Sequence, residues 1–177
     1  MRKYLKLFFS LCLVTGISSC GYTTGSLLPS RLKMISVENF KNKVDYGSES
    51  RRNIYLPLLE VKVTNAVVDR FLFDGSLKIA DSDTADLILR GELLSYDRSP
   101  LRYFENSDDV EEYRIHITVS LVLWDVANDE AMWQENRFVG ESTYFTSGPL
   151  AVSEATAVEE ALTDLARRIV ERTIENW

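Results

Sequence analysis

The sequence is poor in the side chains that form covalent cross-links and catalytic centres. Its 177 residues include two cysteines, Cys12 and Cys20, and a single histidine, His116. Both cysteines lie near the amino terminus, so the rest of the chain has no thiol with which to form a disulfide. Stability must therefore come from an apolar core, which a single-domain length and 45% apolar residues can supply.

Positive charge and long apolar runs are also scarce. The chain has a net charge of −7, and without residues 1–19 the remaining 158 residues have a net charge of −10. Such an acidic chain argues against nucleic-acid binding, which needs a basic surface, although a local basic patch stays possible. Beyond the amino terminus no apolar run is long enough to span a bilayer, so we expect an anchored protein.

The amino-terminal segment is typical of an export signal. A basic stretch over 2–6 precedes an apolar run over 7–14, and small residues over 16–19 lead directly to Cys20. The segment Ile17-Ser18-Ser19-Cys20 resembles the bacterial lipobox, which is cut before its cysteine and acylated on it. The alternative is an ordinary secretory signal in which Cys20 occurs by chance.

The lipobox reading predicts an organisation in three parts. These are a signal peptide over 1–19, a lipidated tether over 20–33 and one domain over 34–177. Several acyl chains on Cys20 would bury many methylene groups and give firm membrane anchoring. Gly21 is compatible with sorting to the outer membrane.

Apolar periodicity predicts two helices. The first opens at Pro57, which suits a first helical turn, and ends at the turn residues Asp74-Gly75. The second occupies the carboxy-terminal segment, where Thr156 and Glu159 form a capping-box pattern. Apolar residues recur at spacings of three and four in both. The two stripes are Leu59, Val63, Ala66, Val67 and Phe71, and then Ala155, Val158, Leu162, Leu165, Ile169 and Val170.

Alternating apolar and polar residues predict the strands. The clearest pattern covers 112–125, and turn chemistry at 127–130 joins it to a partner strand over 132–145. Shorter strands are expected over 34–40, 77–80 and 86–96. Polar composition, and Pro100 in the second case, predict loops over 41–53 and 98–111.

These elements predict an α+β fold in the order β-α-β-β-β-α. The economical arrangement packs two helices on one face of a mostly antiparallel sheet of about four strands.

The sequence shows no pattern typical of a catalytic or metal site. His116 lies in the middle of a strand, on its polar face. The acidic turn at 81–83 lacks the glycine and the spaced glutamate of calcium loops, and the acidic run at 108–112 is typical of a solvated loop. We therefore expect no enzyme activity, no metal and no cofactor apart from the covalent lipid on Cys20.

The chain resembles the lipopolysaccharide-assembly lipoproteins, the LptE family that is also called rare lipoprotein B. The likeness rests on the order of the elements together with the lipobox, and it covers nearly the whole chain after Cys20. The stretches that carry it are Cys20-Gly21-Tyr22, then 85–91, 112–115, 123–125, 131–134 and 138–140, Tyr144, and the closing helix over 157–177. The hairpin turn departs from the Thr-Gly pair expected in this family, because it reads Ala127-Asn128-Asp129.

The resemblance implies a lipoprotein on the periplasmic side of the outer membrane. Such proteins plug the lumen of a large β-barrel translocon of the LptD type, and the pair inserts lipopolysaccharide into the outer leaflet. A plug must offer polar surface to a polar lumen, which an acidic domain provides. The resemblance implies no covalent chemistry and allows direct binding of lipopolysaccharide.

Lipopolysaccharide is anionic, so a site for it needs arginine or lysine. The predicted loop over 98–111 carries Arg98 and Arg102 beside Leu101, Tyr103 and Phe104. We expect these residues to contact lipid or partner; the alternative is a solvated loop whose aromatic side chains close over the core. Further candidates with a weaker case are Arg51-Arg52. Trp124 and Trp133 are expected to pack, and Trp177 to pack or anchor.

Two other classes of function stay open. One is a lipid-anchored binding subunit of another envelope transport or secretion complex. The other is a lipid-anchored enzyme, which would need a clustered acid pair in a pocket.

Overall fold

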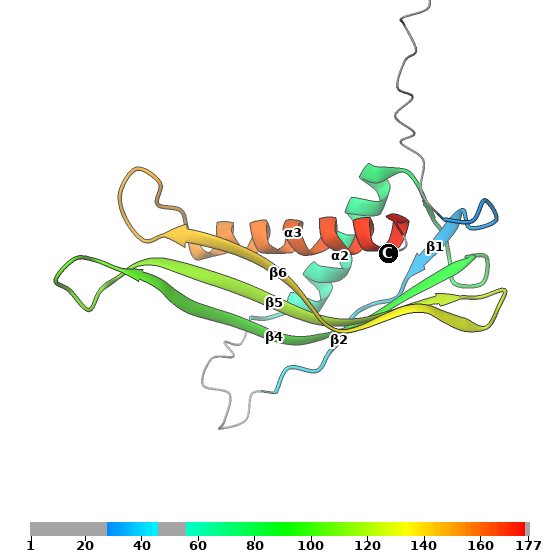
Figure 1. Ribbon diagram of the computed structural model, residues 1–177, viewed down its shortest axis with the longest axis horizontal. Coiled ribbons are helices and arrows are strands. Elements are labelled where there is room, and N and C mark those ends of the chain that lie inside the picture. Colours follow the sequence, from blue (N-terminus) through cyan, green and yellow to red (C-terminus); the bar gives the residue numbers. More distant parts are fainter. Residues whose placement is uncertain (1–27, 46–55, 176–177) are drawn as a thin grey trace, which may run out of the picture.

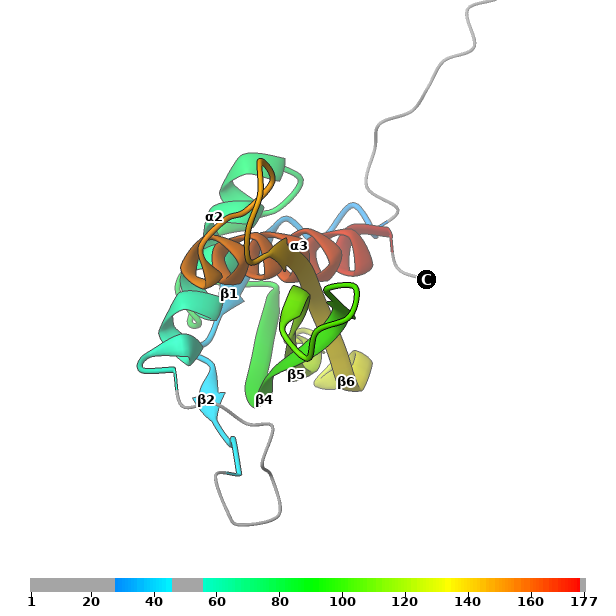
Figure 2. The same ribbon diagram turned by 90° about the vertical axis from the view of Figure 1, so that its left-hand side faces the viewer.

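The computed structural model describes residues 28–45 and 56–175. Its elements in chain order are β1 (Met34–Val37), β2 (Lys41–Asn42), α2 (Leu59–Asp74), β3 (Lys78–Ile79), β4 (Leu87–Tyr103), β5 (Val110–Asp125), β6 (Glu130–Phe145) and α3 (Glu154–Glu175). Three long strands form a curved sheet, and both helices lie on one side of it (Figures 1 and 2). The predicted α+β class and the two helices on one face are confirmed.

The sheet is mixed and has six strands, which corrects the expected antiparallel sheet of about four. Its order is β3-β1-β4-β5-β6, with β2 also paired to β4. β1 runs parallel to both β3 and β4, and β2 runs parallel to β4. A parallel neighbour needs a crossover connection, which α2 supplies between β1 and β3. The strands expected over 34–40 and 77–80 are found as β1 and β3, whereas β2 lies in the segment predicted as a loop over 41–53. The parallel pairing has no local signal, because strands of two to four residues are too short to show a period in the sequence.

The period-two pattern of the long strand is confirmed. Ile115, Ile117, Val119, Leu121 and Leu123 of β5 are all buried beneath the helices. α3 adds Val158, Leu162, Leu165, Ile169 and Val170, as its predicted stripe requires. Ala155 of that stripe is exposed, and Ala157 takes its place in the core. The helix starts before the predicted capping box, because the Ser153 hydroxyl accepts the Thr156 N–H at 3.1 Å.

The predicted loop over 98–111 is wrong for most of its length. β4 continues to Tyr103 and β5 starts at Val110, with Arg98 opposite Ile115 and Arg102 opposite Glu112. The register shifts next to Pro100, where an irregularity accommodates the missing N–H. The sequence misled because a proline in a polar stretch usually ends a strand.

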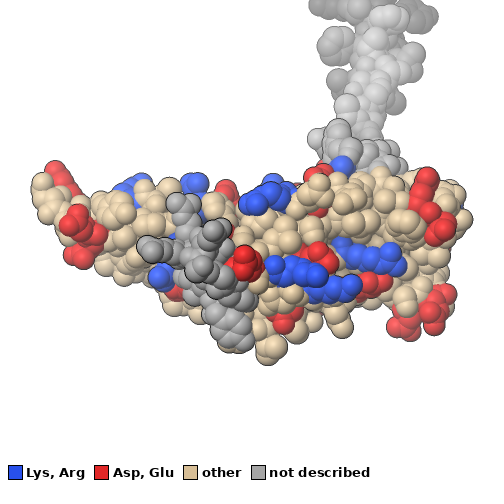
Figure 3. All heavy atoms as spheres, turned by 90° about the horizontal axis from the view of Figure 1, so that it is seen from below, with Lys and Arg blue, Asp and Glu red and all other residues tan. Residues whose placement is uncertain are grey.

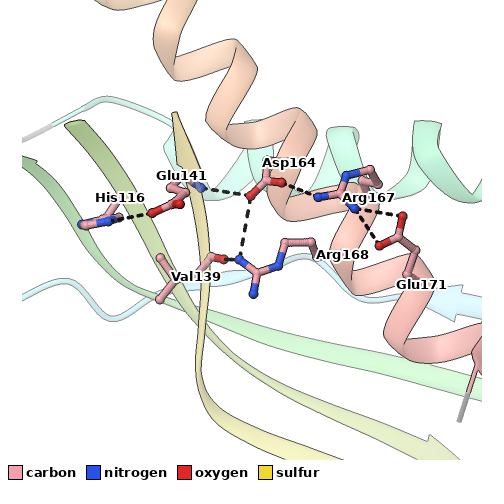
Figure 4. A network of polar contacts seen from close by, with 7 residues as sticks. All are labelled: His116, Val139, Glu141, Asp164, Arg167, Arg168 and Glu171. Atoms are coloured by element: carbon pink, nitrogen blue, oxygen red, sulfur yellow. Dashed lines mark hydrogen bonds and ion pairs between the residues drawn. The ribbon is translucent and has the colours of Figure 1, made fainter. Parts of the chain in front are cut away.

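α3 covers the free edge of β6 at its middle (Figure 4). The Arg168 guanidinium donates to the Val139 carbonyl, and the Asp164 carboxylate accepts the Glu141 N–H at 3.2 Å. Between them lies Gly140, where an added Cβ would come within 2.4 Å of the Leu165 Cβ. Only glycine permits this approach. The helix thereby satisfies backbone N–H and C=O groups on the edge of β6 that could otherwise pair with another strand.

Candidate functional site

The predicted contact residues lie on one long hairpin. Arg98, Arg102 and Tyr103 belong to β4, and Phe104 begins the turn that leads to β5. This hairpin projects beyond the first turn of α3, at the left of Figure 1. Cys20, Arg51-Arg52 and Trp177 lie outside the described residues.

Arg98 takes part in a polar cluster at the base of this hairpin. Its guanidinium forms an ion pair with Glu154 in the first turn of α3. The same carboxylate accepts the Tyr96 hydroxyl at 2.8 Å and the Tyr144 hydroxyl at 3.5 Å. Negative charge suits the amino terminus of a helix, so Glu154 joins the hairpin to α3.

Aromatic rings complete this cluster. The Arg98 guanidinium lies 4.8 Å from the centre of the Tyr113 ring, and Tyr113 stacks on Tyr144 with centroids 5.6 Å apart. Burial, with help from the bond to Glu154, raises the pKa of Tyr96 well above its ordinary value. The phenol therefore stays protonated and remains a donor to the carboxylate. Arg98 is thus one third exposed and already paired, which limits what it can offer a ligand.

Beyond the cluster the hairpin exposes apolar side chains to water. Leu101 is 43% exposed, Tyr103 54% and Phe104 37%. Arg102 lies among them, 3.6 Å from a carboxylate oxygen of Glu112 and above the Phe145 ring. This stretch is an apolar surface with a partly neutralised cation, which suits contact with a protein or lipid surface.

A second segment exposes apolar residues at the same end. The segment over 146–153 contains Leu150, 71% exposed, and Val152, 41% exposed. Thr146 ties this segment to the start of β5, because its hydroxyl donates to the Val110 carbonyl at 2.8 Å. We name residues 99–110 and 146–153 together the distal end of the domain.

The opposite end of the sheet is fixed by buried charge. Asp125 has a side chain only 2% exposed and accepts two hydrogen bonds from Arg31, one of them at 3.1 Å. It also accepts the N–H groups of Ala127 and Asn128 in the β5–β6 turn. Hydrogen bonding from Arg31 holds the pKa of Asp125 below its ordinary value despite the burial of the carboxyl.

The backbone of the first described residues is held at this same end. The Asp86 carboxylate accepts the N–H groups of Lys33 and Met34. We name this region, from Arg31 to Met34 with Asp86 and the β5–β6 turn, the proximal end.

The sheet face turned away from the helices carries charge of both signs. Cations gather over the middle of this face with acidic residues among them, and further acidic residues lie toward its two ends (Figure 3). Lys41, Arg90 and Glu92 help line a shallow depression of about 410 Å³ there. Arg90 is paired with Glu38 at 3.0 Å, and Lys41 has no ion-pair partner among the described residues. This surface therefore offers an anion one unpaired lysine, whereas Arg102 at the distal end already faces a carboxylate.

The described residues contain neither a cluster of metal-binding side chains nor a helix that could span a membrane. No group of three or more histidine, cysteine, aspartate or glutamate side chains is arranged to hold a metal ion. No helix among them has the length and apolar character to cross a membrane.

Comparison with protein families matches residues 32–173 to LptE, described as lipopolysaccharide-assembly. The chain belongs to this family. The LptE match spans every described strand, all of α2 and α3 up to Thr173, so the distal end and all of the proximal end except Arg31 lie within it. The resemblance inferred from the sequence is therefore confirmed. No curated protein matches the sequence of this LptE-family chain.

Solved structures with a similar fold have low sequence identity. Protein XCC0632 from Xanthomonas campestris is 15% identical with a TM-score of 0.54, over 80% of this chain and 83% of that one. Rare lipoprotein B from Shewanella oneidensis is 18% identical with a TM-score of 0.44, over 79% and 89%. The PelC dodecamer from Paraburkholderia phytofirmans is 16% identical with a TM-score of 0.47, over 86% and 94%. XCC0632, the one of these three above 0.5, supports the fold alone.

Sequence reasoning missed the partners of the predicted residues. Glu154 and Tyr144 carried no signal, because they lie 56 and 46 positions after Arg98. The position of Arg114 on the open face could have been predicted from the sequence. Arg114 occupies a polar position in the alternation of β5, which places it on the face opposite the core.

Proposed function

We propose that this chain is an outer-membrane lipoprotein that assists insertion of lipopolysaccharide as the plug partner of a large β-barrel translocon of the LptD type. Membership of the lipopolysaccharide-assembly family over residues 32–173 is the observation that carries the proposal. The lipobox ending at Cys20 supports anchoring by a covalent lipid on the periplasmic side. In this role the protein needs no covalent chemistry and no cofactor.

The distal end supports a role in contacting the barrel. Leu101, Tyr103 and Leu150 are exposed there on a hairpin and a loop that stand clear of the core. Exposed apolar side chains gathered at one end of a domain mark an interaction surface, and aromatic residues contribute most at such contacts. Arg98 serves in this proposal as a positioning residue that holds the hairpin through Glu154.

The open face of the sheet supports contact with an anionic lipid. Lys41 borders the depression on this face and has no ion-pair partner among the described residues, so binding phosphate there would break no existing pair. This assigns lipopolysaccharide to the middle of the open face in preference to Arg102, which already faces Glu112.

The test of the partnership is affinity purification of the tagged full chain from its native membranes in mild detergent, followed by mass spectrometry. We expect a large β-barrel protein at about one copy per lipoprotein. A variant with Leu101→Ser and Tyr103→Ser should recover at least about tenfold less barrel. Val61→Ser on α2, a similarly exposed apolar position, is the matched control and should recover as much as the wild type.

Two outcomes would contradict the proposal. Repeated absence of any barrel would reject the plug role, and recovery of inner-membrane transporter subunits would favour a subunit of another envelope transport complex. Separately, Cys20→Ser should release the protein from membranes, and continued membrane fractionation of that variant would reject the anchor.

A further inference from the structure

The carboxy-terminal end of α2 places two neighbouring apolar side chains in water. Phe73 is 81% exposed, the largest value for a large apolar residue in the described part of the chain, and Leu72 is 63% exposed. The Arg70 guanidinium lies 5.2 Å from the centre of the Phe73 ring. A leucine and a phenylalanine beside a cation form a small amphipathic tip, the combination that settles at the boundary between lipid headgroups and acyl chains.

This tip lies at the proximal end of the domain. α2 ends at Asp74, and four residues later Lys78 in β3 donates its N–H to the Lys33 carbonyl at 2.8 Å. The carboxy-terminal end of α2 and the first described residues accordingly lie on the same side of the molecule in both ribbon views (Figures 1 and 2).

The length of chain ahead of the domain keeps this end near any lipid on Cys20. Leu28 lies eight positions after Cys20, and a fully extended segment of that length reaches about 28 Å at most. The distal end lies farther away, because the 16 residues of β5 span about 50 Å. A membrane that holds Cys20 therefore meets the proximal end first.

We propose that Leu72 and Phe73 dip into the interfacial layer of the membrane to which the chain is anchored, as a second contact beside the lipid. This proposal rests on the lipid anchor of the proposed function. The two contacts together restrict how the domain can turn about its tether.

The charges around the tip nearly cancel, so the contact should depend mainly on the apolar side chains. Asp69 and Asp74 lie next to Arg70, and Lys33 and Lys78 are the exposed cations nearby. These three cations outnumber the two carboxylates by only one, so anionic lipid should add little attraction, and binding should depend only weakly on salt.

The experiment places an environment-sensitive dye at single cysteines in the purified full lipoprotein. Cys20 is blocked when it is acylated, so Phe73→Cys introduces the one reactive thiol of the mature chain. The protein is reconstituted in vesicles of phosphatidylethanolamine and phosphatidylglycerol that carry nitroxide-labelled lipid. We expect nitroxide to quench dye emission at position 73 by about half, because the dye lies at headgroup depth.

Matched positions separate this contact from general proximity to the bilayer. Leu58→Cys lies at the other end of the same helix with 65% exposure, and Tyr103→Cys lies at the distal end. We expect quenching below about one tenth at both. Adding Leu72→Ser to the Phe73→Cys protein should reduce quenching at least about twofold, and circular dichroism checks that each variant is folded.

Each result bears on a different claim. Mass spectrometry of the amino-terminal peptide reports the anchor, and absence of lipid on Cys20 would reject the anchor and the contact with it. If lipid is present but position 73 is quenched no more than position 58, the contact alone is rejected.

Discussion

The proximal and distal ends of this domain are held by different means. At the proximal end a nearly inaccessible carboxylate, Asp125, receives a guanidinium and the N–H groups of a turn. At the distal end the fixing carboxylate, Glu154, is about one third exposed, and the strands continue beyond it with apolar side chains in water. The backbone ladder and a few exposed side-chain contacts, such as that of Arg102 with Glu112, support that extension.

This difference indicates that the proximal end stabilises the fold, whereas the distal end is suited to contact with a partner. A buried carboxylate that accepts several hydrogen bonds is costly to remove, because the N–H groups that it leaves behind lose their acceptor. Exposed leucine and tyrosine side chains contribute little to folding, but their apolar area becomes available when a partner covers them. Substitutions at the proximal end should therefore change the free energy of unfolding, and substitutions at the distal end should change partner binding.

The largest effect is expected from removing the buried carboxylate. Asp125→Ala leaves Arg31 and two N–H groups of the turn without their acceptor, which should lower the free energy of unfolding by about 2–3 kcal/mol. Chemical denaturation followed by circular dichroism measures this change. Asp108→Ala, in the exposed hairpin turn, is the control and should change stability by less than about 0.5 kcal/mol.

A smaller loss is expected at the base of the distal hairpin. Glu154→Ala removes the acceptor shared by Arg98, Tyr96 and Tyr144, but the site is partly hydrated, so about 1 kcal/mol should be lost. Glu159→Ala on the same helix, whose partner Lys62 is exposed, should cost less than about 0.5 kcal/mol. A cost at Glu154 as large as that at Asp125 would remove the distinction between the two ends.

We expect the pH dependence of the free energy of unfolding to arise at the proximal end as well, from Asp125. The folded-state pKa of Asp125 is lowered, so its contribution is complete above its unfolded pKa of about 3.9 and is lost as pH falls through the folded value. The difference in unfolding free energy between wild type and Asp125→Asn should stay constant above about pH 5 and narrow below about pH 4. Denaturant titrations at several pH values test this, and a constant difference down to pH 3 would contradict it.

The sequence predicted the parts of the fold that local pattern determines. The alternation of Ile115, Ile117 and Val119 identified β5, and the spacing of Val63, Val67 and Phe71 identified α2, because burial of one face imposes a period on the chain. The parallel strands β1 and β3 could not be placed in this way. Their position depends on the crossover through α2 and not on their own few residues.

The sequence indicates which residues the candidate site contains, but it does not indicate which residues they contact. The sequence places Arg98 and Arg102 beside aromatic residues, and in the structure each guanidinium lies over an aromatic ring, yet cross-strand pairing across Pro100 decides that they lie in a strand. Their partners come from β5, β6 and α3, and no local pattern connects a strand to a helix 56 residues later. Whether these residues contact lipid or partner stays a prediction that the binding experiments address.

The smallest effect on stability is expected at the distal tip, and it is the sharpest test of the comparison. Tyr103→Ser combined with Leu101→Ser removes two side chains that are 54% and 43% exposed. Because the folded chain leaves about half of each side chain hydrated, the free energy of unfolding should change by less than about 1 kcal/mol. Urea denaturation of this pair, beside Tyr96→Ser as the buried counterpart with about 2 kcal/mol or more of loss, measures the contrast on one strand. A cost above about 1.5 kcal/mol for the tip would mean that these residues support the fold, and reduced barrel recovery by that variant would then report lost folding and not a lost contact.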